Sequence, residues 1–381
     1  MLLLVGYFLG LYFFDSGIGG LIIALVVWGV MSLFAFFRGD NILLALSRAK
    51  KISRDDHPRL YNVVEEMKIA SGLEKVPDIY IIDDPALNAF ATGRDPNRAA
   101  VAITSGLLQK LNRDQLQGVI GHEISHIKNR DVLLMAITAV LLGTIVILAW
   151  YATRILFFSG MARNRRSSSS RMGGSGQTII LVLAIVLMVL APIMAQLIYF
   201  AISRKREYLA DASSALYTRY PEGLASALEK LAASTSQLKS ANKATAPMYI
   251  INPFRKKGMS ASDLTSTHPP ISERIRILRS MAGGASFADY DQAYQQVHKT
   301  SRRIVPASAM ATGAIGLRAA GLEVTEKEPD EIQRARETSD LLWRLSDYKT
   351  ITCDCGTKLR VPPGFKASSI RCPHCGRINP I

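Results

Sequence analysis

Four long apolar runs divide the chain and predict its longest helices. The first extends from Met1 to Phe14, and after a short polar break the second extends from Leu21 to Phe37. The third and fourth, Leu133 to Tyr151 and Thr178 to Ala201, are each long enough to cross a bilayer as a helix. The first two runs predict a transmembrane hairpin over residues 1–37.

Basic residues beside these runs bear on the orientation of the chain. Those between Arg38 and Arg54 follow the second run and, by the positive-inside tendency, place the next domain in the cytoplasm. Residues 132–202 contain the third and fourth runs and an Arg/Ser/Gly-rich loop that is typical of a flexible segment. This loop and the opposite flank each carry five basic residues. Charge therefore does not decide whether these two helices span the membrane or form a partly inserted hairpin.

The apolar segments in residues 38–131 are shorter than the four apolar runs, as is typical of a soluble unit with helices and strands. The segment from Leu60 to Ile69 predicts a helix that ends at Gly72. Two short apolar segments, Ile79–Ile82 and Ala99–Thr104, predict strands. This part of the chain is therefore expected to be an α+β unit.

A third strand is predicted between these two, and it ends at the turn residue Gly93. It comprises Asn88, Ala89, Phe90 and Ala91. At the edge of a sheet, such a strand can bind an extended peptide through main-chain hydrogen bonds. A purely structural strand is the alternative, and the spacing by itself favours that alternative.

A helix predicted to begin at Asn112 carries the residues with the clearest chemistry. Asn112 and Gln115 have the spacing of a capping box, and the apolar residues that follow have helical spacing. His122 and His126 lie four residues apart in an H-E-x-x-H sequence, so both imidazoles can bind one metal ion. Glu123 lies one residue further round, where it can act as a base rather than a ligand. The pattern predicts a hydrolytic zinc site, and the alternative is an amphipathic helix that carries two histidines by chance.

A catalytic zinc site of this kind needs a third protein ligand. Residues 203–285 begin on a predicted continuation of the fourth apolar helix, and Glu207 is the candidate ligand there. Asp211 shares its face and is placed to orient a histidine ligand by hydrogen bonding. Two antiparallel apolar helices would bring Glu207 close to His126 just outside the bilayer. The alternative is a solvated helix face with salt bridges.

His268 precedes two prolines that end one element and open the next. In this position it could donate a hydrogen bond to the oxyanion of a tetrahedral intermediate. The alternative is a surface histidine in a turn, which is the more common case.

The C-terminal part of the chain has a different character. Residues 286–349 lose the apolar periodicity and predict a linker with one short helix, which contains Leu341, Leu342 and Trp343 and either faces a partner or docks. Residues 350–381 contain all the cysteines of the chain, which are Cys353, Cys355, Cys372 and Cys375. Two cysteine pairs on glycine-containing turns suit a tetrahedral four-thiolate zinc, so this segment predicts a zinc ribbon. His374 is an alternative ligand, and disulfides would need an oxidising compartment.

Composition agrees with a membrane protein that carries polar domains. Hydrophobic residues make up 49% of the 381 residues, concentrated in the apolar runs, and the net charge is +15. The basic residues gather beside the apolar runs, which suits contact with an anionic lipid surface. Nucleic-acid binding is not expected, because the predicted catalytic region has no basic stripe with interleaved aromatic residues.

Taken in order, these motifs resemble the HtpX-type membrane zinc metalloproteases, which are related to the CAAX prenyl protease group. The resemblance extends from about Leu60 to Leu278. It rests on Asn88–Gly93, Ala99–Thr104, Gly121–Asp131, Arg206–Asp211, His268–Pro270 and Arg274–Ile275. The tail after about Gly284 departs from the family pattern.

The resemblance implies a mostly α structure with a small β-sheet, in which an α+β, zincin-like catalytic domain is joined to transmembrane helices. It implies that zinc is bound by His122, His126 and Glu207 and that Glu123 is the general base. It also favours Asp211 as the residue that orients a ligand. The resemblance further favours His268 as an active-site residue. It also favours the strand that begins at Asn88 as a substrate-binding edge.

The expected protein is a zinc endopeptidase that degrades misfolded or membrane proteins at the cytoplasmic face of the plasma membrane. It is expected to contain one catalytic and one structural zinc, and its expected partners are the bilayer, unfolded or membrane protein substrates, and a protein that binds the ribbon. One alternative is a catalytically silent membrane adaptor, against which the intact Glu123 argues. The other is a protease for prenylated peptides, which would need a large enclosed apolar cavity.

Overall fold

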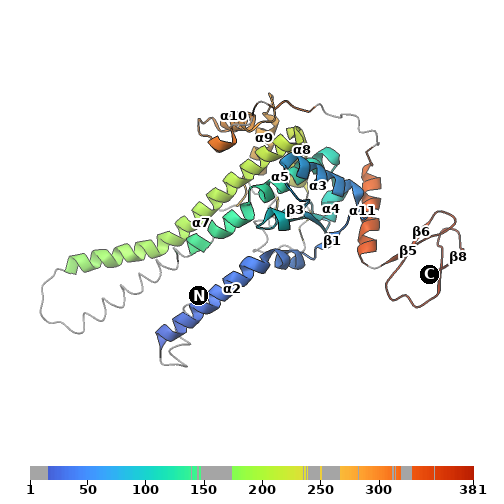
Figure 1. Cartoon of the computed structure of the whole chain (residues 1–381), viewed down its shortest axis with the longest axis horizontal. Helices are drawn as coiled ribbons and strands as arrows, with labels where there is room; N and C mark the ends of the chain where they lie inside the picture. The colour runs from blue at the N-terminus through green and yellow to red at the C-terminus, as the bar shows by residue number, and fades with distance from the viewer. Residues whose placement is uncertain are drawn as a thin grey trace. The chain divides into compact units, whose positions relative to one another are not determined.

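The computed structural model describes most of the chain as two compact units, and Figure 1 labels most of their helices and several of their strands. The first unit ends at Ala49 and the second begins at Lys50. The described residues are 16–138, 140–143, 146, 174–234, 236, 238, 249–250, 267–281, 283–310, 313, 315–318, 328–346 and 348–381.

The first unit, within the described residues, is the single helix α2, Gly17–Leu46. Ser16 caps its N-terminus, because the Ser16 hydroxyl accepts a hydrogen bond of 3.1 Å from the N–H of Gly19. The helix continues beyond Phe37, where the sequence predicted the end of the hairpin, because further apolar residues follow up to Leu46. The first predicted run, Met1 to Phe14, lies outside the described residues.

Membrane crossing was predicted for the apolar helices. Within the part of the chain that the structure describes, no helix combines the length and the apolar character that crossing a bilayer requires. The predicted transmembrane helices are therefore not confirmed.

The second unit contains a four-stranded sheet. Its strands are β1 (Lys50–Ile52), β2 (Asp78–Ile82), β3 (Ala89–Thr92) and β4 (Ala100–Thr104), in the order β1-β2-β4-β3. The β2–β4 pair is parallel and the other two pairs are antiparallel. The three strands predicted from the sequence are present, whereas β1 was not predicted because its three residues are too few to show a period. Strand β3 lies at one edge of the sheet.

Helices pack around this sheet and enclose the core. They are α3 (Pro58–Ser71), α4 (Ser105–Lys110), α5 (Arg113–Lys128), α7 (Gly174–Thr218), α8 (Pro221–Ala233) and α9 (Ile271–Arg279), and a short 3₁₀ turn, η1, spans Pro96–Arg98. Helix α5 contacts α3, α7 and α8 (Figure 1), and its residues Leu116, Val119 and Ile120 are fully buried. The core therefore lies between α5, its neighbouring helices and the sheet.

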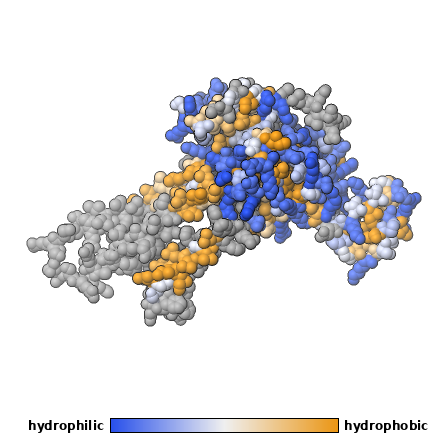
Figure 2. All heavy atoms as spheres, in the orientation of Figure 1, coloured by the Kyte–Doolittle hydropathy of each residue, from blue (hydrophilic) through white to orange (hydrophobic). Residues whose placement is uncertain are grey.

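Helix α7 joins the fourth apolar run to residues 203–218, the start of the predicted second half of the catalytic domain. It runs without interruption from Gly174 to Thr218 and includes Pro192. This confirms that Ser203 to Asp211 continue the apolar helix. On the apolar side of α7, large hydrophobic side chains are exposed (Figure 2), and these include Val186, Leu190, Ile193, Met194, Leu197 and Ile198.

The segment predicted as a linker contains more structure than expected. It forms α10 (Phe287–His298), a 3₁₀ turn η3 (Ala307–Ala309) and α11 (Glu331–Leu345). Helix α10 packs against α7 and α9, and α11 packs against α4. The buried face of α10 is formed by Tyr290, Asp291 and Ala293, and the charged Asp291 is not a residue that apolar spacing would place there. Helix α11 therefore docks on α4 within its own unit, which is the second of the two alternatives predicted for it.

Candidate metal centre

Helix α5 positions the two motif histidines. The predicted capping box is present: the Asn112 side chain accepts a hydrogen bond of 2.9 Å from the N–H of Gln115, whose side chain accepts one of 3.2 Å from the N–H of Asn112. His122 is fully buried, and its Nε2 lies 3.2 Å from Nε2 of His126. The two nitrogens therefore face the same point, as the four-residue spacing predicts.

Helix α7 brings Glu207 to this point. Its Oε2 lies 3.5 Å from Nε2 of His122, and its Oε1 lies 3.5 Å from Nε2 of His126. One ligand atom from each of these three residues lies within 4.8 Å of the others. The predicted ligands are thus brought together and could hold a metal ion.

The polar atoms around this point fit a metal ion. Among the described residues, no group makes a hydrogen bond of normal geometry to Glu207 Oε2 or to either carboxylate oxygen of Glu123, and all three atoms are buried. Arg274 Nη1 lies 3.4 Å from Glu207 Oε2. Such burial is costly unless another group satisfies the oxygens. Burial acts to raise the pKa of Glu207. The opposite effect of His268 and the two motif histidines is larger, so the pKa of Glu207 lies well below its usual value. Glu207 is therefore ionised. Two imidazoles and one carboxylate form a donor set that zinc takes in catalytic sites.

Glu123 lies beside the ligands but is not one of them. It is buried, and this burial raises its pKa, while the charges of His122 and His126 act to lower it. The backbone N–H of Ala91 on β3 also favours the ionised form of Glu123. A carboxylate with a raised pKa, close to metal ligands, has the properties of a general base.

Asp211 contacts His122, as the sequence predicted. Its Oδ1 lies 3.0 Å from His122 Nδ1. Arg274 of α9 binds the same carboxylate with two hydrogen bonds, from Nε over 2.8 Å and from Nη2 over 2.7 Å. The sequence analysis gave Arg274 no role, although a signal was present: Arg274 falls on the apolar face of α9, three residues before the buried Ile277.

Asp131 is a second residue whose role the sequence analysis missed. Its Oδ2 lies 2.7 Å from Nδ1 of His126, and its Oδ1 accepts a hydrogen bond from Arg206. The side chain is buried. Asp131 was part of the motif stretch, but five residues separate it from His126, and this spacing does not by itself predict a contact.

His268 is buried near the ligands rather than exposed in a surface turn. Its Nε2 lies 3.9 Å from Oε1 of Glu207, and its Nδ1 lies 2.9 Å from the hydroxyl of Thr267. The structure therefore places it with the predicted metal ligands. Its part in catalysis remains a prediction.

Part of the outer edge of β3 is already paired. The carbonyl of Ala89 accepts a hydrogen bond of 3.0 Å from the N–H of Ile250, and Phe90 forms an antiparallel bridge with Tyr249. The Asn88 carbonyl bonds to β4 instead, where it accepts from the N–H of Thr104. Of the four predicted strand residues, Ala91 is the one whose backbone N–H faces Glu123. Substrate binding by β3 remains a prediction.

Comparison with known proteins gives the family. The family model described as "Peptidase family M48" matches residues 54–282. The chain belongs to peptidase family M48. A protease HtpX homolog of Dictyoglomus turgidum is 47% identical over 269 residues, which cover 71% of this chain and 84% of that protein. Another, from Streptococcus pneumoniae, is 44% identical over 281 residues, which cover 74% and 93%. The HtpX-type resemblance is thereby confirmed.

A solved structure is also similar to this M48 chain. It is the crystal structure of S. mikatae Ste24p, with a TM-score of 0.41 and 20% sequence identity. The alignment covers 73% of this chain and 62% of that chain, so it includes less than two thirds of the Ste24p chain.

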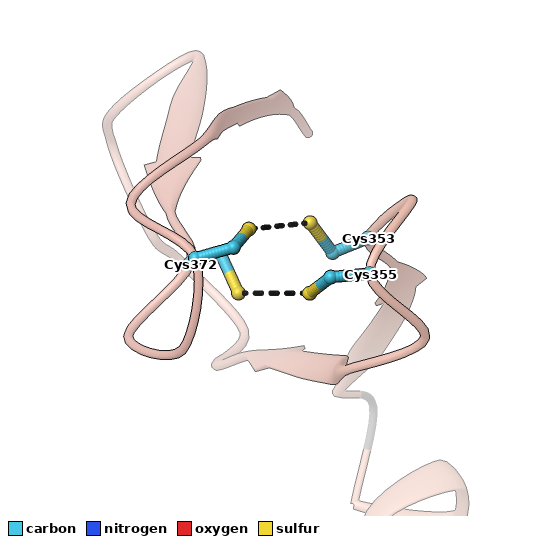
Figure 3. Close-up of side chains that lie close together, drawn as sticks. Cys353, Cys355 and Cys372 are labelled. Carbon is cyan, nitrogen blue, oxygen red and sulfur yellow. Dashed lines mark hydrogen bonds between the residues drawn. The ribbon is translucent and has the colours of Figure 1, made fainter.

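The M48 match contains all residues of the candidate metal centre and ends before the tail. The tail ends in two antiparallel hairpins, β5 (Lys349–Thr352) with β6 (Lys358–Val361) and β7 (Ser369–Arg371) with β8 (Ile378–Pro380). Cys353 Sγ lies 3.6 Å from Cys375 Sγ, and Cys355 Sγ lies 3.7 Å from Cys372 Sγ (Figure 3). All four are free thiols, and their sulfurs lie within 4.8 Å of one another. This arrangement fits the predicted four-thiolate site, and His374 is not part of it.

Proposed function

We propose that this M48 protein is a membrane-bound zinc endopeptidase. The observation that carries the proposal is the convergence of His122, His126 and Glu207 on one point, with the buried carboxylate of Glu123 beside it. These four residues divide into two roles. The first three would hold the zinc ion, and Glu123 would act on water.

Zinc supplies Lewis-acid polarisation of the scissile carbonyl and of the attacking water when it is bound. Glu123 takes a proton from this water as the water oxygen bonds to the carbonyl carbon. Glu123 then gives this proton to the leaving nitrogen as the C–N bond breaks, and the products are one carboxylic acid and one amine. Burial suits Glu123 to the first step, because its raised pKa makes it a better proton acceptor than an exposed glutamate.

Further residues would bind the substrate and stabilise the charge that develops on the carbonyl oxygen. His268 is buried 3.9 Å from Glu207 and could donate a hydrogen bond to this oxygen. The substrate main chain would pair with the outer edge of β3 near Ala91, where the edge lies next to Glu123. The contacts of Ala89 with Ile250 and of Phe90 with Tyr249 limit this pairing to the part of the strand that follows Phe90.

The proposed location is the cytoplasmic face of the plasma membrane. The exposed apolar side chains of α7, including Leu190, Ile193 and Met194, support contact with lipid. Basic residues such as Arg204 and Lys205 come directly after this apolar stretch and suit anionic headgroups. The proposed substrates are misfolded and membrane proteins, which a main-chain binding mode would accept with little regard to sequence. The ribbon would hold a second, structural zinc and bind a protein partner.

The test is cleavage of an unfolded model protein by the full-length chain in detergent, with and without zinc. We expect zinc-dependent cleavage by the wild type and by Glu229→Gln, which alters an exposed glutamate. We expect Glu123→Gln to keep its zinc but lose cleavage, and His122→Ala to lose zinc. Cleavage by Glu123→Gln would refute the mechanism. A zinc-loaded wild type that cleaves nothing would instead favour a membrane adaptor that acts through its ribbon.

A further inference from the structure

The rings of His126 and His122 are held by the same kind of arrangement. In each, a carboxylate contacts Nδ1 of the histidine, and an arginine donates a hydrogen bond to that carboxylate. Asp131 Oδ2 lies 2.7 Å from His126 Nδ1, and Asp131 Oδ1 accepts from Arg206. Asp131 is 4% exposed, so water screens these contacts little. Both oxygens of this carboxylate are therefore used, one on each partner.

The backbone that carries Asp131 has an unusual conformation. Helix α5 ends at Lys128, and Arg130 then takes a left-handed conformation with a φ of 53°. This conformation is disfavoured for a residue with a Cβ atom. Helical hydrogen bonding resumes directly afterwards, because the N–H of Leu134 bonds to the carbonyl of Arg130 over 3.0 Å. The break turns Asp131 back toward His126, and disfavoured conformations of this kind are found where other contacts hold them in place.

Arg206 connects this pair to the third candidate ligand. It directly precedes Glu207 on α7, so a contact between Arg206 and Asp131 links the end of α5 to the turn of α7 that carries Glu207. A carboxylate on Nδ1 of a histidine also fixes the proton there and leaves Nε2 free to bind a metal. The ion pair between Asp131 and Arg206 therefore contacts the ring of His126 and also the turn of α7 that carries Glu207.

We propose that Asp131 and Arg206 are positioning residues of the metal centre. Asp131 holds His126 as the Nδ1–H tautomer, with Nε2 directed at the metal. Arg206 holds Asp131 in place and fixes the distance between His126 and Glu207. This inference rests on the proposed function, because it assigns the pair a task only if the centre binds a metal.

The first test compares Asp131→Asn with Asp114→Asn in the full-length protein. Asp114 is a matched control, since it lies on the same helix and also pairs with an arginine, Arg318. We expect Asp131→Asn to bind zinc about 10- to 100-fold more weakly in competition with a chelator. We also expect it to alter the absorption spectrum of the Co²⁺-substituted protein and to lower kcat more than it changes KM. Wild-type zinc affinity and an unchanged Co²⁺ spectrum in Asp131→Asn would overturn the proposal.

A second variant separates positioning from a purely structural ion pair. The double variant Asp131→Arg/Arg206→Asp restores opposite charges between the two helices but puts no carboxylate at position 131. We expect its thermal stability to recover relative to Asp131→Arg, while its zinc affinity stays low. Recovery of zinc affinity together with stability would mean that the pair is only structural. Neither readout requires peptide cleavage, so a wild type that binds zinc but cleaves nothing would refute the endopeptidase and not this inference.

Discussion

Arg274 of α9 and Asp211 of α7 form a fully buried ion pair, in which the guanidinium donates two hydrogen bonds of 2.8 and 2.7 Å to one carboxylate. The same carboxylate contacts His122. Both groups are inaccessible to solvent, so each charge is stabilised by its neighbours in the protein, and Arg274 Nη1 also lies 3.4 Å from Oε2 of Glu207. Removal of one partner from a buried pair costs far more than the loss of a surface salt bridge.

We therefore expect Arg274→Leu to lower the free energy of unfolding by about 3–5 kcal/mol, because it removes the cation that pairs with Asp211 and leaves this buried carboxylate with His122 as its neighbour. Arg276→Leu is the control, since Arg276 is exposed on the same helix, and it should change stability by no more than about 0.5 kcal/mol. Urea unfolding of the purified protein measures both. Equal unfolding midpoints for the two variants would show that the buried pair contributes little.

A second prediction concerns the close approach of α5 and α8. A Cβ atom on Gly118 would lie 2.6 Å from the backbone nitrogen of Leu224, a distance that real Cβ contacts do not reach. Gly118→Ala should therefore push the two helices apart and cost about 1–3 kcal/mol, despite the better helix propensity of alanine. Gly143→Ala is the control, because nothing lies within 4 Å of its added Cβ atom. Thermal unfolding should show a lower midpoint for Gly118→Ala only, and a midpoint equal to that of the control would contradict the prediction.

The sequence predicted the parts of this molecule that depend on local chemistry. The capping box of α5 needs only residues three positions apart, and the left-handed end of α3 needs only a glycine, Gly72, at a φ of 68°. The convergence of His122 and His126 follows from helix geometry alone. Glu207 could be proposed as a ligand because catalytic zinc needs a third one, although its contact with α5 is long-range.

The sequence could not predict contacts that depend only on tertiary packing. Arg274 meets Asp211 across 63 positions of the chain, and the charge of Arg274 weakens the apolar pattern of α9. Asp131 reaches His126 only because the backbone turns at Arg130. The pairing of Ile250 with β3 likewise brings together segments with no local signal for it.

A third prediction concerns the pH dependence of stability. His57 caps α3, where its Nδ1 accepts a hydrogen bond of 3.1 Å from the N–H of Leu60. Burial, with a smaller effect from the charge of Arg59, lowers the pKa of His57 to about 4 from a usual value of 6.5. Between these two pH values the unfolded chain binds a proton at His57 and the folded chain does not. Stability should therefore fall as the pH falls through this range, by about 3 kcal/mol in total.

The variant His57→Asn isolates this effect, because asparagine keeps a capping acceptor but does not titrate. We expect wild type and His57→Asn to be similarly stable at pH 7.5. At pH 4.5 the wild type should have lost about 2–3 kcal/mol more than the variant. Urea unfolding at both pH values, with a chelator present throughout, removes the contribution of metal binding. Parallel pH profiles for the two proteins would rule out His57 as the source.

The last prediction separates the two candidate metal sites. The described residues contain one cluster of His122, His126 and Glu207 and another of the four cysteines, and the two clusters share no residue. Cys372 is buried in the small core of the ribbon, where it packs with Leu359. Because such a core is too small to fold by itself, the metal should supply much of its folding free energy.

Cys372→Ser should therefore lose about one equivalent of zinc and expose the ribbon to proteolysis, while cleavage of the model substrate continues. His122→Ala should also lose about one equivalent, but it should keep a protease-resistant ribbon and lose cleavage. Ser368→Ala, an exposed change in the ribbon, is the control and should retain both metals. Metal analysis combined with limited proteolysis measures each outcome. If Cys372→Ser lost both metals and all activity, the ribbon and the catalytic centre would be one cooperative unit, and the contacts of Lys358 and Arg360 with Asp340 on α11 would be the first candidates for the link.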